Sequence, residues 1–189
     1  MKKKILIVED ESIIRMDIKF MLQDQGYEVI GEAGDGERAI ELAFLHKPDL
    51  ILMDIKMPKI NGLQASKIIA NQLDLPILII TAYSQKEFIE KAQQDNIVGY
   101  LVKPISEASL IPAIEIALHQ SDKAKRLKKD IQNAQREVEK RKLIERAKGI
   151  LMQAEELAEP EAFKRLRESS MARQMTMVSV AKEIILKYK

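Results

Sequence analysis

Short apolar runs recur through the first two thirds of the chain and are separated by turn residues. They lie at residues 5–8, 27–33, 50–53, 77–80 and 98–102. The second run alternates apolar and polar positions, whereas the third is continuous, as in strands buried on both faces of a parallel sheet. Met57-Pro58 and Asn61-Gly62 end the third run and turn the chain. These runs predict five β-strands.

Amphipathic segments follow each predicted strand, with apolar residues at helical spacing. The first follows Ser12, a residue suited to cap a helix because its hydroxyl accepts a hydrogen bond from a first-turn N–H. The other segments start near Asp35, Gly62, Gln85 and Ser106. Strand and helix alternate five times, which predicts an α/β fold with a doubly wound, five-stranded parallel sheet.

Chemically active side chains stand where the predicted strands end. In chain order they are Glu9, Asp10, Asp54, Thr81 and Lys103. The carboxyl ends of parallel strands share one edge of the sheet, where open α/β sheets bind ligands. Crowded carboxylates repel each other, and a hard cation with oxygen ligands, such as Mg²⁺, relieves that repulsion. A lysine and a hydroxyl nearby are suited to phosphoryl oxygens, so the residues predict that Asp54 accepts a phosphoryl group with Mg²⁺.

Each of these residues also has a plain structural interpretation. A lone aspartate after a strand commonly forms a turn, and Thr81 is a β-branched residue of the kind that strands favour. Their joint occurrence at successive strand ends favours the functional interpretation. His46 and His119 show no ligand spacing, and we interpret both as surface residues that are neither phosphoacceptors nor metal ligands.

Composition excludes several classes of protein. The chain has no cysteine, which excludes a disulfide framework and a thiolate metal site. The apolar run near the N-terminus is too short for a signal peptide, and no run approaches the ~20 apolar residues of a membrane span. We therefore expect a cytoplasmic protein without a membrane partner. Residues 1–120 carry a net charge of −5 and residues 121–189 a net charge of +7, which indicates an anionic partner for the second part.

The residues at the strand ends resemble those of the receiver domain of bacterial two-component response regulators, over roughly residues 3–120. The resemblance implies a flavodoxin-like fold and phosphorylation of Asp54 by a sensor histidine kinase. It implies Mg²⁺ held by Glu9, Asp10, Asp54 and the backbone carbonyl of Lys56. It also implies that Thr81 moves toward the phosphoryl group while Tyr100 turns inward as a switch, although a plain core aromatic remains the alternative for Tyr100. Many members carry aspartate where this chain has Glu9.

Residues 121–142 contain no glycine or proline and are rich in charged side chains, which favours a helix. Four apolar residues in this segment follow a 4-3-4 spacing, typical of a coiled coil: Leu127, Ile131, Ala134 and Val138. Only about two heptads are present, fewer than a secure coiled-coil assignment needs. A single solvated helix remains the alternative to a helical linker that pairs with a second copy.

Residues 143–189 predict a small unit of three helices. Pro160 suits the first turn of the second helix, and Phe163 is expected in the core. Three sequence blocks resemble the ANTAR domain, a three-helix RNA-binding module of transcription antiterminators: IERAKGILM at 144–152, EAFKRLRESSM at 161–171 and VAKEII at 180–185. Family members tend to carry glycine near Glu156 and serine or threonine near Ala158, and both are absent here.

The second resemblance implies a target, which is a pair of small RNA hairpins in a leader transcript. Lys148 and Arg167 match family motif positions, and three further RNA-binding candidates rest on charge alone: Arg146, Arg165 and Arg173. A solvated helix face remains the alternative for any one of them. Aromatic residues are scarce in this unit, so base stacking is not the expected mode of binding.

Together the two resemblances imply an antiterminator, not an enzyme, with a receiver domain at 1–120, a linker at 121–142 and an ANTAR domain at 143–189. Phosphorylation of Asp54 would favour a homodimer, and two modules would then hold two hairpins that cannot fold into the terminator. The alternatives are a DNA-binding transcriptional regulator, whose usual glycine-containing turn the sequence does not show, and a protein-interaction module. Among antiterminators, the whole chain most resembles regulators of ethanolamine utilisation.

Overall fold

The computed structural model of the protein describes residues 2–82 and 96–188. The chain divides into two compact units, residues 1–125 and 126–189. A single helix, α5 (Glu107–Ala154), contributes residues to both units. The predicted helix that starts near Gln85 lies outside the described residues, and the predicted domain boundaries at 120 and 142 stay predictions.

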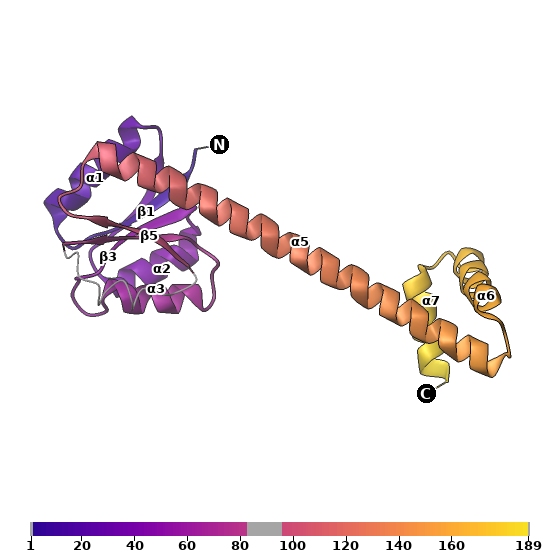
Figure 1. The fold of residues 1–189 in the computed structure, drawn as a ribbon. Helices are drawn as coiled ribbons and strands as arrows, with labels where there is room; N and C mark the ends of the chain where they lie inside the picture. Colours follow the sequence, from indigo (N-terminus) through magenta and orange to yellow (C-terminus); the bar gives the residue numbers. More distant parts are fainter. Residues whose placement is uncertain (1, 83–95, 189) are drawn as a thin grey trace. The chain divides into compact units, whose positions relative to one another are not determined.

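Five parallel strands form one sheet in the first unit, in the order β2-β1-β3-β4-β5 (Figure 1). They are β1 (Lys4–Val8), β2 (Glu28–Ala33), β3 (Leu50–Asp54), β4 (Ile77–Thr81) and β5 (Ile97–Val102). The chain winds outward from β1 in both directions, which places the carboxyl ends of β1 and β3 at the topological switch point. The predicted doubly wound sheet is confirmed.

Helices cover both faces of this sheet (Figure 1). Alternate residues of β1 serve two cores: Ile5 and Ile7 pack with residues of α1 (Ser12–Asp24) and the start of α5. Leu6 and Val8 pack with residues of α2 (Gly36–His46) and α3 (Gly62–Ala70). All five residues of β3 are buried, because the central strand has a helical layer on each side.

A side-chain cap explains where α2 begins, whereas the cap predicted for α1 is absent from the described residues. The Asp35 carboxylate accepts a hydrogen bond from the N–H of Arg38 at 2.9 Å and starts α2. The prediction that Ser12 caps α1 is wrong, because Ser12 is already the first helical residue. The cap position belongs to Glu11, whose backbone carbonyl accepts from the N–H of Arg15 at 2.9 Å while its side chain caps nothing.

Gly62 brings the start of α3 against the end of β3. Its N–H donates to the carbonyl of Ile55 at 3.0 Å, and a Cβ at this position would collide with the backbone oxygen of Asp54. Only glycine fits such a close approach. The loop 55–61 is therefore folded back on the strand end that carries Asp54.

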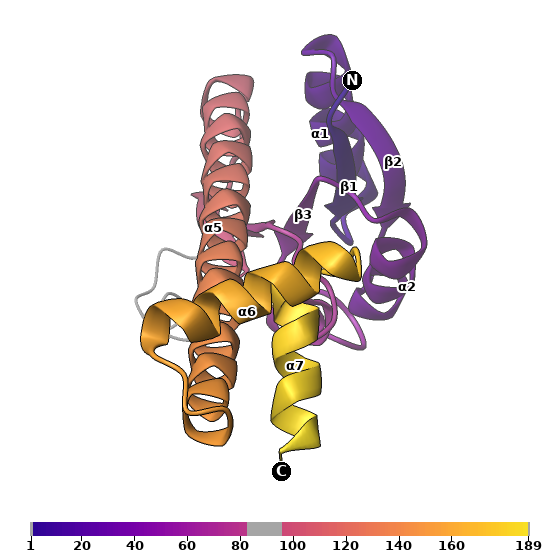
Figure 2. The ribbon, with the colours of Figure 1, turned by 90° about the vertical axis from the view of Figure 1, so that its right-hand side faces the viewer.

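The second unit is formed by the later part of α5 with α6 (Glu159–Ala172) and α7 (Met177–Lys187). Figure 2 shows α6 lying across α7. Its buried core consists of small and branched side chains, namely Ala147, Leu151, Ala162, Leu166, Val180 and Ala181. The predicted three-helix arrangement is confirmed, but one expected core residue is not in it. Phe163 is 44% exposed, because Ala162 and Leu166 one turn apart face the core and the helix turns Phe163 away.

Residues 121–142 lie within α5, so the predicted helical linker is confirmed as part of a longer helix. Leu127, Ile131 and Val138 are each more than half exposed, and Ala134 is exposed as well. Pairing of this apolar seam with a second copy stays a prediction. Within residues 2–82 and 96–188, no helix combines the length and the apolar character that crossing a bilayer requires.

The turn between α5 and α6 carries a backbone conformation that suits glycine better than its own residue. Glu156 has φ of 55°, in the left-handed region that costs an L-residue about 1–2 kcal/mol. Ala158 occupies the N-cap of α6 without a side-chain acceptor, and Glu161 accepts from its N–H at 3.1 Å. The two departures from the ANTAR pattern therefore fall at a left-handed residue and at a helix cap, where glycine and serine or threonine have a physical purpose.

Glu156→Gly should stabilise the second unit by about 0.5–1 kcal/mol, because glycine adopts this conformation without strain. Thermal unfolding followed by helical circular dichroism measures the effect. Gln153→Gly is the matched control: it is also exposed but helical, and it should destabilise by about 1 kcal/mol. A lower unfolding temperature for Glu156→Gly would contradict this explanation of the turn.

Candidate functional site

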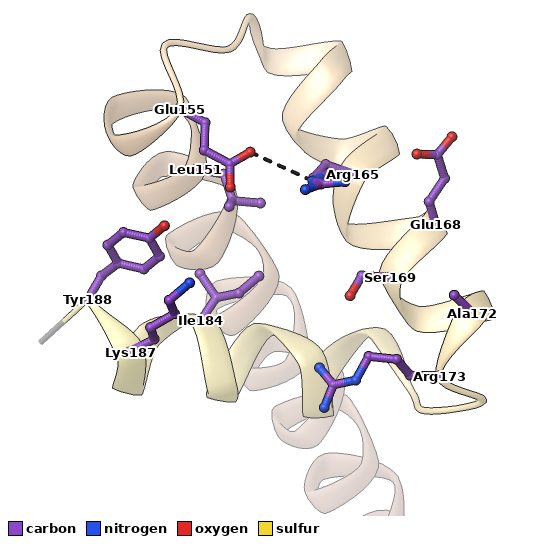
Figure 3. A pocket seen from close by; sticks show the side chains of 10 residues that line it. All are labelled: Leu151, Glu155, Arg165, Glu168, Ser169, Ala172, Arg173, Ile184, Lys187 and Tyr188. Carbon is purple, nitrogen blue, oxygen red and sulfur yellow. Dashed lines mark ion pairs between the residues drawn. The ribbon is translucent and has the colours of Figure 1, made fainter.

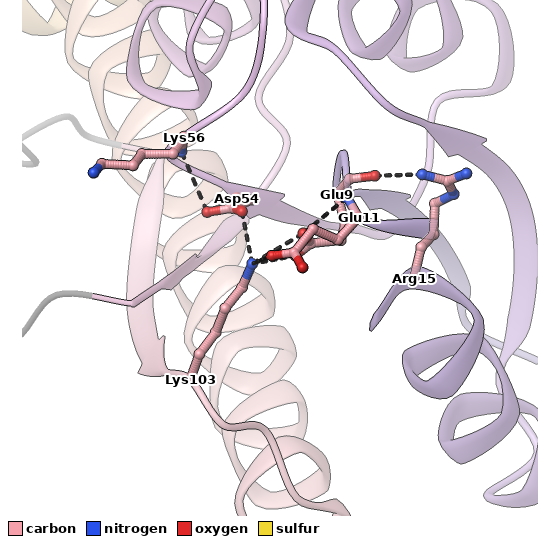
Figure 4. A network of polar contacts seen from close by, with 6 residues as sticks. All are labelled: Glu9, Glu11, Arg15, Asp54, Lys56 and Lys103. Carbon is pink, nitrogen blue, oxygen red and sulfur yellow. Dashed lines mark hydrogen bonds and ion pairs between the residues drawn. The ribbon is translucent and has the colours of Figure 1, made fainter. Parts of the chain in front are cut away.

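The strand-end residues of the first unit form one cluster of charged side chains (Figure 4). Asp54 is the last residue of β3, Glu9 directly follows β1, and Lys103 directly follows β5. The Nζ atom of Lys103 lies 2.8 Å from Oδ2 of Asp54 and 2.9 Å from Oε1 of Glu9. The structure thus joins residues that are 94 positions apart in the sequence.

Three carboxylates in this cluster are placed to share a cation. Glu9, Asp10 and Asp54 each offer an oxygen, and these oxygens lie within 4.8 Å of one another. Glu9 and Asp54 are buried while Asp10 is exposed, so the cluster opens to solvent at Asp10. One ammonium group does not neutralise three carboxylates, and the remaining charge of −2 with purely oxygen donors fits Mg²⁺. The acidic pocket is of the kind that holds Mg²⁺ in receiver domains.

Burial and charge act in opposite directions on the ionisation of the cluster. Burial raises the pKa of the Glu9 carboxyl, the hydrogen bond from Lys103 opposes that shift, and the negative charge of Asp54 adds to it. Burial lowers the pKa of Lys103, but its hydrogen bonds to Asp54 and Glu9 outweigh burial and leave that pKa raised. Lys103 therefore stays charged, and Glu9 holds a proton more readily than an exposed glutamate does.

The remaining predicted receiver residues surround this cluster. Thr81 is buried at the end of β4, and its carbonyl accepts from the N–H of Lys103 at 2.8 Å. The N–H of Lys56 donates to Oδ1 of Asp54 at 3.3 Å, and Lys56 lines a cavity of about 470 Å³ together with Asp10. Tyr100 is 54% exposed, so an inward position would require its side chain to move.

Sequence reasoning missed two residues of the cluster. Arg15 of α1 donates to the backbone carbonyl of Glu9, and the carboxylate of Glu11 lies 3.9 Å from Lys103 (Figure 4). The sequence carries no signal for Arg15, because its partner is a backbone atom that any residue would supply. His46 and His119 are exposed, as predicted, and neither is part of the cluster of Glu9, Asp10 and Asp54.

In the second unit, Lys148 is buried, whereas the four arginine candidates are exposed. It is 8% exposed, and its Nζ lies 2.6 Å from Glu145 and 2.7 Å from Glu159. The hydrogen bonds to these two glutamates raise the pKa of Lys148, and the same contact lowers that of Glu159. In this arrangement Lys148 ties α5 to the first turn of α6, so its role as an RNA contact stays a prediction.

Among the described residues, two of the four arginine candidates form ion pairs and two do not. Arg165 lies 3.7 Å from Glu155 and Arg173 lies 2.6 Å from Glu183, and both arginines line one cavity of the unit (Figure 3). Arg146 and Arg167 are exposed and form no ion pair with any residue that the structure describes. The candidates thus do not form one continuous patch of free cations.

Two family models match the chain. Residues 5–115 match the response regulator receiver domain, and residues 132–185 match the ANTAR domain. Transcriptional regulatory protein PdtaR of Mycobacterium tuberculosis is 46% identical over 184 residues, which cover 97% of this chain and 89% of that protein. Transcriptional regulatory protein YdfI of Bacillus subtilis is 36% identical over 61% of this chain, a match that covers 54% of YdfI.

Solved structures match the first unit. The signal receiver domain of the putative response regulator NarL from Mycobacterium tuberculosis has a TM-score of 0.59 at 28% identity, over 62% of this chain and 97% of that one. Chemotaxis protein CheY4 of Vibrio cholerae has a TM-score of 0.59 at 31% identity, over 62% of this chain and 99% of that one. The narrower resemblance to regulators of ethanolamine utilisation stays a prediction. The chain belongs to the response regulators, and it is a non-enzymatic transcriptional regulator that joins a receiver domain to an ANTAR domain.

Proposed function

We propose that this protein is an antiterminator whose binding to hairpin RNA is controlled by phosphorylation of Asp54. The observation that carries the proposal is the cluster at the strand ends, where the Asp54 carboxylate lies 2.8 Å from Lys103 and beside two further carboxylates. The same chain carries an ANTAR domain, a family that binds RNA. A chemical input and an RNA output are therefore combined in one molecule.

The input step is transfer of a phosphoryl group from a phosphohistidine of a sensor kinase. An oxygen of Asp54 attacks the phosphorus, a P–O bond forms, and the bond from phosphorus to the histidine nitrogen breaks. Mg²⁺, held by Glu9, Asp10, Asp54 and the carbonyl of Lys56, would neutralise charge on the transferring group. Lys103 would bind a phosphoryl oxygen, and Thr81 would supply its hydroxyl from the adjacent strand end.

The conformational step is a shift of the receiver population toward a form that dimerises. Thr81 and Lys103 stand at the ends of β4 and β5, so a phosphoryl group that both contact acts on that edge of the sheet. Tyr100 on β5 is exposed and would turn inward in the active form. The exposed seam of Leu127, Ile131, Ala134 and Val138 would then pair with that of a second copy.

The output step is binding of two RNA hairpins by two ANTAR modules. Linking two weak sites raises the overall affinity by roughly 10²–10⁴-fold, so dimerisation alone can switch binding on. Arg146, Arg165, Arg167, Arg173 and Lys148 are the proposed contacts to phosphates and loop bases. The proposed partners are a kinase, which uses ATP, and a nascent transcript. Both partners imply that the protein acts in the cytoplasm. RNA held as two hairpins cannot form the terminator.

A mobility shift assay tests the proposal against its alternatives. The full chain is treated with acetyl phosphate and mixed with a hairpin RNA pool or with random duplex DNA. Binding to hairpin RNA, strengthened by phosphorylation, is expected. Binding to duplex DNA alone would instead identify a DNA-binding regulator, and binding to neither would identify a protein-interaction module.

Asp10→Asn should weaken Mg²⁺ binding by about tenfold or more, because it replaces one of the three carboxylates with a neutral amide. Mg²⁺ titration followed by NMR measures the affinity, and Asp17→Asn, an exposed carboxylate on α1, is the control. Burial raises the pKa of Glu9 and Mg²⁺ needs the ionised form, so affinity rises with pH. Below that pKa it falls about tenfold per pH unit. If the affinity for Mg²⁺ changed neither with Asp10→Asn nor with pH, this cluster would be excluded as the Mg²⁺ site.

Asp54→Ala should prevent phosphorylation by acetyl phosphate, observed as the loss of one phosphoryl group from the intact mass. The treated wild type should dimerise and bind hairpin RNA on the order of a hundredfold more tightly, because two linked sites then act together. The variant should show neither change. Asp24→Ala, at an exposed position of α1, should behave as wild type. RNA affinity that rises equally in the Asp54 variant would disprove the switch.

Arg167→Ala should reduce the slope of log affinity against log salt by about one, since it removes one phosphate contact. The unfolding temperature should not change, because Arg167 is exposed. Lys148→Ala should also reduce the slope, but it should lower the unfolding temperature too, because Glu159 and Glu145 lose their partner. An unaltered slope in both variants would exclude both residues as phosphate contacts.

A further inference from the structure

A cavity of about 370 Å³ lies in the second unit between the end of α5, α6 and α7 (Figure 3). Its volume falls within the roughly 300–1,000 Å³ of sites that bind small molecules. Its lining combines apolar, aromatic and cationic side chains, chiefly Leu151, Ile184, Tyr188, Arg165, Arg173 and Lys187.

The two arginines on this cavity are held in position without being buried. Arg165 is 64% exposed and is paired with Glu155, while Arg173 is 48% exposed and is paired with Glu183. Each carboxylate restricts the motion of its arginine, and solvent still reaches the guanidinium groups. A phosphate at the rim would therefore meet cations that are already oriented, which reduces the entropic cost of binding.

Tyr188 provides a flat surface on the same cavity. It caps α7, and its backbone N–H donates to the carbonyl of Ile184 at 3.2 Å, which fixes where its side chain starts. The residue is 44% exposed, and Nζ of Lys187 lies 5.3 Å from the centre of its ring. An aromatic ring next to a cation suits a ligand that is flat at one end and anionic at the other.

We propose that this cavity holds one unstacked nucleotide of the bound RNA. The base would stack on Tyr188 over the apolar floor, and its phosphate would lie between the cationic groups of the rim. Glu155, Glu168 and Ser169 also line the cavity and offer oxygen acceptors to the N–H groups of a base. The proposal rests on the proposed function, and it adds a base-recognition site to an RNA contact that charge alone had suggested. It departs from the expectation that bases do not stack on this unit, because Tyr188 lines the cavity together with apolar and cationic side chains.

Other ligands fit this lining less well. An inorganic phosphate would leave the apolar floor and the ring without a partner. An acidic peptide would use the cationic groups, but it would leave the ring of Tyr188 without a flat partner. A nucleotide uses the apolar, aromatic, cationic and acceptor groups together.

The test uses the full chain, phosphorylated by acetyl phosphate, and an RNA hairpin pool with a constant stem and a randomised loop. A loop that binds the wild type is selected, and each loop base is then removed in turn to leave an abasic position. One position should cost the wild type on the order of tenfold in affinity. Tyr188→Ala should bind the intact hairpin about tenfold more weakly, and removal of that same base should then cost nothing more. Tyr188→Phe, which keeps the ring, should behave as wild type.

Two further variants control for the position of the ring and for the space in the cavity. Phe163→Ala removes another aromatic of the same unit that is also 44% exposed, and it should retain the full cost of the abasic position. Ala172→Phe fills the cavity without removing a polar group, and it should reproduce the effect of Tyr188→Ala. Circular dichroism verifies that each variant is folded.

The outcomes separate this inference from the function on which it rests. In one outcome the wild type binds hairpins, but each abasic position reduces the affinity of Tyr188→Ala as much as that of the wild type. The cavity is then not a nucleotide site, and the proposed function stands. If Phe163→Ala removes the cost instead, the base lies elsewhere and the inference is wrong. If the wild type binds no hairpin of the pool, the proposed function and the inference fail together.

Discussion

The ammonium group of Lys103 balances two carboxylates at the strand ends, and the receiver unit depends on that balance. Glu9 is fully buried and Asp54 is nearly so, and isolated charges in such places are strongly unfavourable. Lys103 follows β5, which is separated from β3 by β4 in the sheet. Its side chain must therefore extend past the end of β4 to reach Asp54, which explains why a long cationic residue is needed there.

The same geometry makes the cluster sensitive to added charge. A phosphoryl group carries about −1.5 to −2 charge, so its transfer to Asp54 would more than replace the charge of the carboxylate. Lys103 would have to satisfy this new group together with Glu9, while its N–H remains bonded to the carbonyl of Thr81. A shift of Lys103 is thereby coupled to the ends of β4 and β5, the edge that also carries Tyr100.

What the sequence could predict depended on how directly topology fixes the position of a side chain. Asp54, Glu9 and Lys103 were predictable as neighbours, because strand ends in a parallel sheet must share one edge. Phe163 was wrongly placed in the core, because a helix face is set by tertiary packing and one residue step rotates it by about 100°. The pairing of Lys148 with Glu159 and the cavity beside Tyr188 had no sequence signal, since they arise where separate helices meet.

In both units cationic side chains are paired with carboxylates, but the carboxylates differ in burial. Lys103 is held by carboxylates that are buried, whereas Lys148, Arg165 and Arg173 are held by carboxylates at least a third exposed. An RNA phosphate at these residues would have to compete with the carboxylates, so the net charge of the second part would overstate its attraction for a polyanion. Arg146 and Arg167, without ion pairs among the described residues, are available for long-range attraction. The paired cations would instead meet an RNA at more restricted positions, and such positions would favour recognition of RNA shape over a gain in affinity.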